Sequence, residues 1–316
     1  KLKATGTNSN LKSIAWENGS YFIAGSAGYL YQGTIFNEQF SASELMMNTG
    51  HPVSQDVTED LNSLVLIQGK MYVVGQNGCT LYSPQINNFG LAKTYQGNQS
   101  LNHISVYSQS GTTKFLSCGL ASTVLSHVGG STIARKDLFL TGIKDVHFSS
   151  ISNGTLLAGN SIMRRMNANQ QWKTIKPDAA SSAVLYGKYC KVWTISEIKS
   201  LAVGVYAGAM IQNDTASISA SLPTNVLDVV ANQNMYYFAK SDEVIGMTIS
   251  SSGSFGTPTT YNYTGQQINS IDVLDNNDFA VAGENGFFAY QGISSGSVFT
   301  SSIQNADIND LKFVDH

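Results

Sequence analysis

The chain has 316 residues, of which 42% are hydrophobic and only 12% are charged, and its formal net charge is −3. These values exclude a collagen-like or disordered chain, and no apolar run reaches the roughly 18 residues of a membrane-spanning helix. The small negative charge gives no reason to expect nucleic acid or a membrane as a partner. The low charge content and the abundance of Ser, Thr, Asn and Gly favour β structure.

The composition of the chain indicates a cellular location, and its cysteines indicate whether a metal site is expected. The first residue is Lys1 rather than a methionine. A polar, proline-poor chain with few charges is typical of an exported bacterial protein, so we expect an extracytoplasmic location, periplasmic or secreted. Cys79, Cys118 and Cys190 are far apart and form no Cys-x-x-Cys pair. We therefore expect buried apolar cysteines, no metal site and no cofactor.

An internal repeat runs along the whole chain. Each copy has an apolar residue, a second one three positions later and a third two positions after that. The copies begin at Leu11, Leu61, Leu101, Ile143, Tyr189, Val226, Ile268 and Ile308. They lie 37 to 50 residues apart, about 42 on average, in the range of a four-stranded propeller blade. Because strand residues three apart point to opposite faces, each copy predicts a strand buried on both faces.

A second signature follows about ten residues after the start of most copies. It consists of apolar residues and then Gly-x-x-Gly, and it is clearest at Gly25–Gly28, Gly75–Gly78 and Gly283–Gly286. The signature predicts a second strand that ends in a tight turn, where glycine adopts a positive φ without steric penalty. A third strand follows, as at Tyr29–Tyr31, and then a fourth strand, as at Phe89–Tyr95. Each repeat therefore predicts four short strands.

The repeat count predicts the architecture. We expect one all-β domain over residues 1–316, a single β-propeller with seven four-stranded blades; eight or six blades are the alternatives. Residues 1–6 resemble a fourth strand, and residues 308–313 resemble a first strand. A strand borrowed from the opposite terminus would then close the ring.

The combined pattern I-x-x-h-x-F…h-h-V-G-x-x-G-h-h-h-x-S, where h is apolar, resembles a known group of repeats. It is similar to photosystem II stability/assembly-factor-like propellers and to the wider BNR/Asp-box repeats, best at 61–83 and 268–290. The resemblance implies a propeller. The strict Asp-box, Ser-x-Asp-x-Gly-x-Thr-Trp, is absent, so no family binding site is carried over. Sialidases are a catalytic branch of such propellers, and they need three arginines from separate blades to bind a carboxylate. Arg164 and Arg165 are neighbours in one predicted strand, so they point to opposite faces and cannot easily enter one pocket. We therefore do not expect sialidase activity.

Six polar residues are candidate ligand-binding residues at the mouth of the central channel. They lie in or beside the predicted first strands: His103, Asp145, His147, Asp228, Asp272 and Asp310. Two carboxylates separated by about 5 Å or by about 6.5–9.5 Å suit glycoside hydrolysis. His103, Asp145 and His147 would form a polar cluster across neighbouring blades. The alternative for each residue is a structural role, such as accepting a backbone hydrogen bond or capping a turn.

The longest repeat step contains an insertion, Met46–Asp60, which is either a recognition loop or an ordinary surface excursion. Propellers present their loops at two faces and host many unrelated functions. We expect an exported, non-enzymatic scaffold that binds a protein or glycan through its loops or central mouth. The alternative is a carbohydrate-active hydrolase that uses the carboxylates at the channel mouth.

Overall fold

The computed structural model confirms an all-β protein. It describes residues 10–17, 20–36, 39–86, 90–95, 98–109, 112–120, 123–128, 132–137, 145–148, 155–158, 162–165, 173–174, 176–177, 190–195, 199–204, 206–212, 215–274, 277–293, 296, 298–302 and 307–311. Within these ranges the one α-helix, α1 (Val53–Asp56), has four residues. None of the helices in these ranges has the length and apolarity that crossing a membrane requires.

The chain divides into two compact units. The first unit comprises residues 1–138 with 284–286 and 301–316, and the second comprises residues 139–283 and 287–300. The described strands of the first unit form three sheets of four strands. They are β1 (Leu11–Glu17), β2 (Ser20–Gly25), β3 (Leu30–Phe36) and β4 (Gln39–Glu44); β5 (Leu61–Ile67), β6 (Lys70–Gly75), β7 (Cys79–Ser83) and β8 (Ala92–Tyr95); and β9 (Leu101–Gln109), β10 (Thr112–Gly119), β11 (Thr123–Val128) and β12 (Thr132–Asp137).

The described strands that follow form four further sheets. They are β13 (Asp145–Phe148), β14 (Thr155–Ala158), β15 (Ile162–Arg165) and β16 (Lys173–Thr174); β17 (Lys176–Pro177), β18 (Cys190–Thr194), β19 (Lys199–Gly204), β20 (Gly208–Gln212) and β21 (Thr215–Ile218); β22 (Asp228–Asn232), β23 (Met235–Ala239), β24 (Glu243–Thr248) and β25 (Thr259–Asn262); and β26 (Ile268–Val273), β27 (Phe279–Gly283), β28 (Phe287–Gln291) and β29 (Val298–Ser302). Short 3-10 turns, η1 (Gln76–Gly78) and η2 (Glu284–Gly286), join β6 to β7 and β27 to β28.

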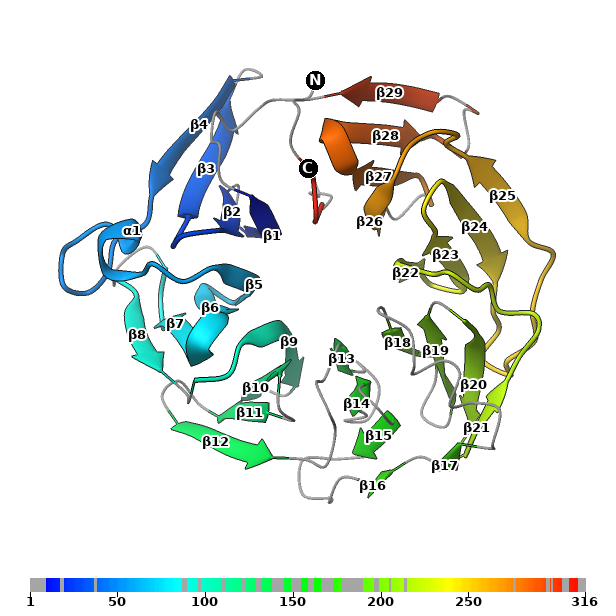
Figure 1. The fold of residues 1–316 in the computed structure, drawn as a ribbon, viewed down its shortest axis with the longest axis horizontal. Helices are drawn as coiled ribbons and strands as arrows, with labels where there is room; N and C mark the ends of the chain where they lie inside the picture. Colours follow the sequence, from blue (N-terminus) through cyan, green and yellow to red (C-terminus); the bar gives the residue numbers. More distant parts are fainter. Residues whose placement is uncertain are drawn as a thin grey trace. The chain divides into compact units, whose positions relative to one another are not determined.

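Each sheet is an antiparallel meander in chain order, as Figure 1 shows. The exception is β17, which pairs in parallel with β21 and makes its sheet five-stranded. Seven of the eight predicted first strands coincide with β1, β5, β9, β13, β18, β22 and β26. In the eighth copy, the described residues 307–311 are not in a strand. The predicted strand at residues 1–6 lies outside the described residues, and β29 is the fourth strand of the last sheet.

A β-bulge corrects one prediction about the first strands. The register between β5 and β6 shifts between Leu61 and Ser63. This shift places Leu61 and Leu64 in the same core cluster, with Met71 and Val73, rather than on opposite faces. The bulge inserts one residue and so reverses the alternation of side chains. The strand is nevertheless covered on both faces, because its other side packs on the next core cluster.

The same arrangement recurs in the second unit. Ile268 and Ile271 share one cluster, and a register shift separates Ile268 from Ser270. Second strands contribute buried residues to each of the four described core clusters. On β6, for example, Met71 and Val73 face one cluster, and Tyr72 and Val74 face the next. Side chains with period two that are buried on both faces explain why these strands read as continuous apolar runs.

The two glycines of the Gly-x-x-Gly signature have different roles. Gly78 has a φ of +70°, as the tight-turn prediction requires. Gly75, with a φ of −156°, is extended instead. A Cβ on Gly75 would lie 2.2 Å from the carbonyl oxygen of Asp60. The first glycine is therefore needed for the close approach of two backbones, and only the second is needed for its positive φ.

Candidate binding site

The six candidate residues from the sequence are divided between the two units. His103 on β9 and Asp310 belong to the first unit, whereas Asp145 and His147 on β13, Asp228 on β22 and Asp272 on β26 belong to the second. The side chains of Asp145 and His147 lie outside the described residues. Asp228 and Asp272 are on β22 and β26, the first strands of consecutive sheets, and Asp272 is 6% exposed.

Two of the candidate carboxylates accept backbone hydrogen bonds. Asp310 Oδ2 accepts the amide of Ile14 at 3.0 Å, and Asp228 Oδ2 accepts the amide of Ile271 at 3.2 Å. Asp228 Oδ2 also lies 3.4 Å from Ser270 Oγ, which donates to it. Both carboxylates therefore take part in contacts between chain segments that are far apart in sequence.

Serine performs the same task in other copies of the repeat. Ser13 Oγ accepts the amide of Leu64 at 3.2 Å, and Ser63 Oγ accepts the amide of Ile104 at 3.4 Å. In all four cases the acceptor is the third residue of one copy and the donor is the fourth residue of another. The polar third residue thus satisfies a backbone amide that the neighbouring strand pair leaves without a partner.

The second residue of the repeat adds a companion bond. Asn62 Nδ2 donates to the carbonyl oxygen of Leu101 at 2.8 Å, and Asn309 Nδ2 donates to that of Leu11 at 3.1 Å. An Asn followed by Ser or Asp therefore makes two bonds to one neighbouring strand. We call this pair of bonds the inter-strand clasp. The bonds of the third residue alone give Asp228 and Asp310 a structural role, because each accepts a backbone amide.

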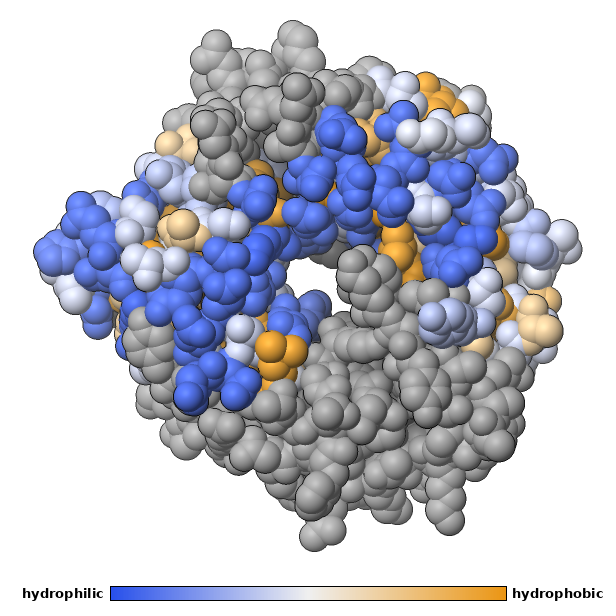
Figure 2. Space-filling view, viewed as in Figure 1, coloured by the Kyte–Doolittle hydropathy of each residue, from blue (hydrophilic) through white to orange (hydrophobic). Residues whose placement is uncertain are grey.

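The insertion Met46–Asp60 is packed against the first unit. Met47, Val53 and Val57 are buried in its core cluster. Met47 also forms a parallel bridge with Leu91, so the insertion joins the edges of the first two sheets. Figure 2 shows that hydrophilic residues predominate on the outer surface around α1.

Asp60, the last residue of the insertion, connects three segments. Its Oδ2 accepts Lys12 Nζ at 2.8 Å, and its Oδ1 accepts the amide of Ala27 at 3.1 Å. Gln76 Nε2 donates to the same Oδ2 at 3.3 Å. The Lys12 hydrogen bond, with smaller contributions from the Ala27 amide and the Lys12 charge, holds the Asp60 pKa below its usual value despite partial burial. Ionised Asp60 therefore stabilises the folded chain.

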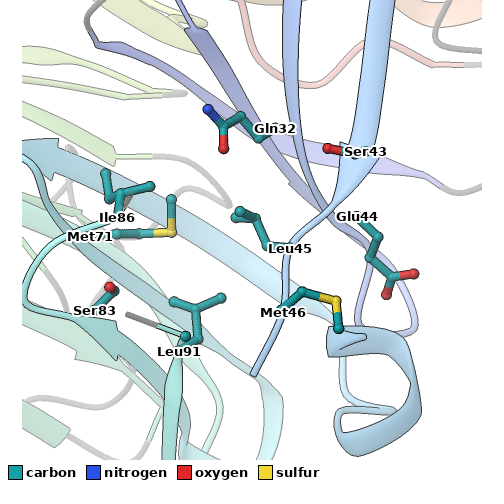
Figure 3. Close-up of a pocket in the computed structure, with 10 residues that line it drawn as sticks. Gln32, Ser43, Glu44, Leu45, Met46, Met71, Ser83, Ile86 and Leu91 are labelled. Atoms are coloured by element: carbon teal, nitrogen blue, oxygen red, sulfur yellow. The ribbon is translucent and has the colours of Figure 1, made fainter. Parts of the chain in front are cut away.

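A pocket of about 320 Å³ lies beside this insertion, within the first unit. Figure 3 shows its lining, which comes from β3, β4 and the residue pair after it, β6, β7 and the connection to β8. The lining residues are Gln32, Ser43, Glu44, Leu45, Met46, Met71, Ser83, Ile86, Gly90 and Leu91. We call it the Met46 pocket.

The Met46 pocket has an apolar wall and an accessible methionine. The partly buried Leu45 and Ile86 supply apolar surface, whereas Met71 and Leu91 are buried in the core cluster. The side chain of Met46 is 46% exposed, which is high for a large apolar residue. Unbranched methionine adapts its shape to different occupants. Such a pocket can receive an apolar group from outside.

The sequence pointed to one part of this site only. The long repeat step drew attention to Met46, but the rest of the wall comes from segments distant in the chain. Met71 and Ser83 are ordinary core positions of their strands, and nothing in the repeat pattern distinguishes them.

Comparison with known proteins gives the class of fold. No protein-family model matches the sequence, and no curated protein is significantly similar to it. Among solved structures, the chain is similar to the WD40 β-propeller domain of Doa1, with 13% identity, a TM-score of 0.57, and coverage of 98% of this chain and 87% of that one.

Two structures of YCF48 are also similar. YCF48 from Cyanidioschyzon merolae has 9% identity and a TM-score of 0.59, with coverage of 88% of this chain and 94% of that one. YCF48 bound to D1 peptide has 8% identity and a TM-score of 0.61, with coverage of 87% and 91%. The protein is therefore a β-propeller. YCF48 is a photosystem II assembly factor, so this likeness agrees with the propeller resemblance found in the sequence.

Proposed function

We propose that the protein is a non-enzymatic β-propeller scaffold that binds a protein partner through the Met46 pocket. The pocket carries the proposal, because its lining includes the exposed Met46 and the partly buried Leu45 and Ile86. The similarity to a propeller bound to a peptide supports a protein as the partner class. Burying one large apolar side chain contributes about 1.5–3 kcal/mol, a gain of about tenfold to 150-fold in the affinity of a peptide that also makes other contacts.

A random-peptide phage library tests this function. The wild-type protein is expected to enrich peptides that share a large apolar side chain. Met46→Asp, at an exposed position, is expected to weaken the selected peptides by tenfold or more, because it places a charge beside the apolar wall. Tyr206→Asp is the matched control, since Tyr206 is 64% exposed and lies in the second unit.

The outcomes separate the alternatives. Loss of peptide binding in Met46→Asp alone supports the proposal, provided that circular dichroism shows both variants folded. Equal loss in both variants, or undiminished binding by Met46→Asp, overturns the pocket as the site. Enrichment of no peptide, with binding to a defined sugar on a glycan array, overturns the protein partner and favours the glycan.

The proposal also covers the number of blades, the repeat family and the location of the protein. The seven described sheets support a propeller of seven blades. Kinship with BNR/Asp-box repeats and an extracytoplasmic location, as expected for an exported bacterial protein, remain proposals from the sequence alone. The carbohydrate-active hydrolase also remains a prediction, and two of its carboxylates, Asp228 and Asp310, accept backbone amides.

A further inference from the structure

A fixed carboxylate stands at the margin of the Met46 pocket. Glu44 is one of the lining residues, and Figure 3 shows its carboxylate beside Met46. Its Oε1 accepts the amide of Ser54, in α1, at 2.6 Å. Glu44 is also close enough to Tyr31 to raise the pKa of that phenol, after burial, which is the larger cause. Glu44 is therefore positioned by the first unit.

The groups that hold Glu44 are neutral. A backbone amide and a protonated phenol carry no charge at neutral pH, and no ion pair joins Glu44 to a cation among the described residues. A carboxylate offers about four lone-pair positions, so these partners leave acceptor capacity unused. Within the part of the chain that the structure describes, the Glu44 charge has no cationic partner.

Two basic residues of the first unit, Lys93 and His51, already contact other groups. Lys93 donates to the carbonyl oxygen of Asp56 and lies 3.5 Å from Glu59 Oε2. His51 Nδ1 lies 3.4 Å from Asp56 Oδ1. Movement of either residue toward Glu44 would break an existing contact. A cation on a binding partner would complement the Glu44 charge.

We propose that the Met46 pocket recognises a peptide segment in which a large apolar side chain is close in sequence to a lysine or arginine. The apolar side chain packs on Leu45, Met46 and Ile86, and the cation pairs with Glu44. This inference rests on the proposed function, because it names the chemistry of the partner at the same site. Electrostatic complementarity of this kind selects among partners that share an apolar anchor.

Synthetic variants of one library-selected peptide test the inference. Three peptides would keep the apolar anchor and carry Lys, Gln or Glu at a neighbouring position. The Lys peptide is expected to bind about threefold to tenfold more tightly than the Gln peptide, and the Glu peptide more weakly than either. The preference should fall as salt rises, because the pair is partly exposed.

Glu44→Gln isolates the charge. Glutamine keeps a carbonyl oxygen for the Ser54 amide, so the fold of the insertion is expected to persist. This variant should bind all three peptides about equally, whereas Glu284→Gln, an exposed change in the same unit, should retain the Lys preference. Retention of the Lys preference by Glu44→Gln overturns the inference.

Other outcomes separate this inference from the proposed function. If the peptides bind with no charge preference and Met46→Asp still abolishes binding, the function stands and this inference fails. If Met46→Asp leaves binding intact, both fail. If light scattering shows that the protein forms a dimer that Met46→Asp dissociates, a second copy occupies the pocket and the inference is wrong.

Discussion

At the scale of single residues, one glycine signature meets two separate needs. Gly78 adopts a left-handed conformation, while Gly75 allows the carbonyl of Asp60 to approach the backbone. The same close approach recurs at Gly25, Gly119 and Gly283, where an added Cβ would lie 1.7–2.5 Å from a backbone oxygen. The sequence could indicate that glycine was required at both positions. It could not distinguish the need for a positive φ from the need for a close approach of two backbones. The carbonyl group that approaches the first glycine belongs to the residue just before the first strand, about 15 residues earlier in the chain.

Gly75→Ala should therefore be more costly than substitution of a glycine that has only a positive φ. We expect it to lower the free energy of unfolding by about 2–3 kcal/mol, since the new methyl group meets backbone that cannot rotate away. Gly265→Ala is the control. Gly265 has a φ of +79° and open space around it, so only about 1 kcal/mol of conformational strain is expected. Urea unfolding measures both, and equal losses would contradict this explanation.

Asp60 gives the first unit an acid-sensitive contact. Its pKa is lower in the folded chain than in the unfolded chain, so its contribution is complete above the unfolded value of 3.8 and is lost as pH falls through the lower folded value. Asp60→Asn should reduce stability at pH 7. It should also flatten the part of the stability curve below about pH 4. Melting temperatures of both proteins across this range provide the measurement, and parallel curves would show that Asp60 contributes nothing.

At the scale of elements, the first strands β1, β5, β9 and β26 each pair with a register shift, and β5 combines this shift with the inter-strand clasp. The apolar spacing predicted the strands correctly, and β1, β5, β9 and β26 begin where the repeat copies begin. It did not predict the bulge, because the first and fourth residues of the repeat are apolar whether or not a bulge separates them. The Asn and Ser or Asp between them were visible in the sequence. Their role required the neighbouring strand, which is about 40 residues away.

Removing one acceptor at the third position of the repeat tests these bonds between first strands. Ser13→Ala should lower the free energy of unfolding by about 1–2 kcal/mol, because the buried Leu64 amide loses its side-chain acceptor. Hydrogen exchange at the Leu64 amide should accelerate as well. Ser251→Ala, at an exposed serine, should change neither quantity. If both substitutions have the same effect, the bond to Leu64 carries no net stability.

At the scale of the whole molecule, the division into two units was not visible in the sequence. The repeat continues across residue 138 with similar spacing, so no composition change marks the division. The candidate site was equally hidden. Its wall comes from the first two sheets, and only the inserted segment between them departs from the repeat.

The C-terminal segment belongs to the first unit and holds β1. Asp310→Ala should expose the Ile14 amide, so its hydrogen exchange should accelerate at least tenfold relative to the β6 amides. Asp310→Asn keeps an oxygen acceptor and should restore most of the protection. Unchanged exchange in Asp310→Ala would mean that Ile14 is protected by other contacts.

The contact between Asp310 and Ile14 spans 296 residues. A ribosome that adds about 5–20 residues per second needs roughly 15 to 60 s to make that length of chain. During this interval β1 has already been synthesised, but Asn309 cannot yet donate to Leu11 and Asp310 cannot yet accept the Ile14 amide. For most of its synthesis, the nascent chain would therefore have a β1 strand that lacks its hydrogen bonds to Asn309 and Asp310. A chaperone that bound β1 would matter most during this interval.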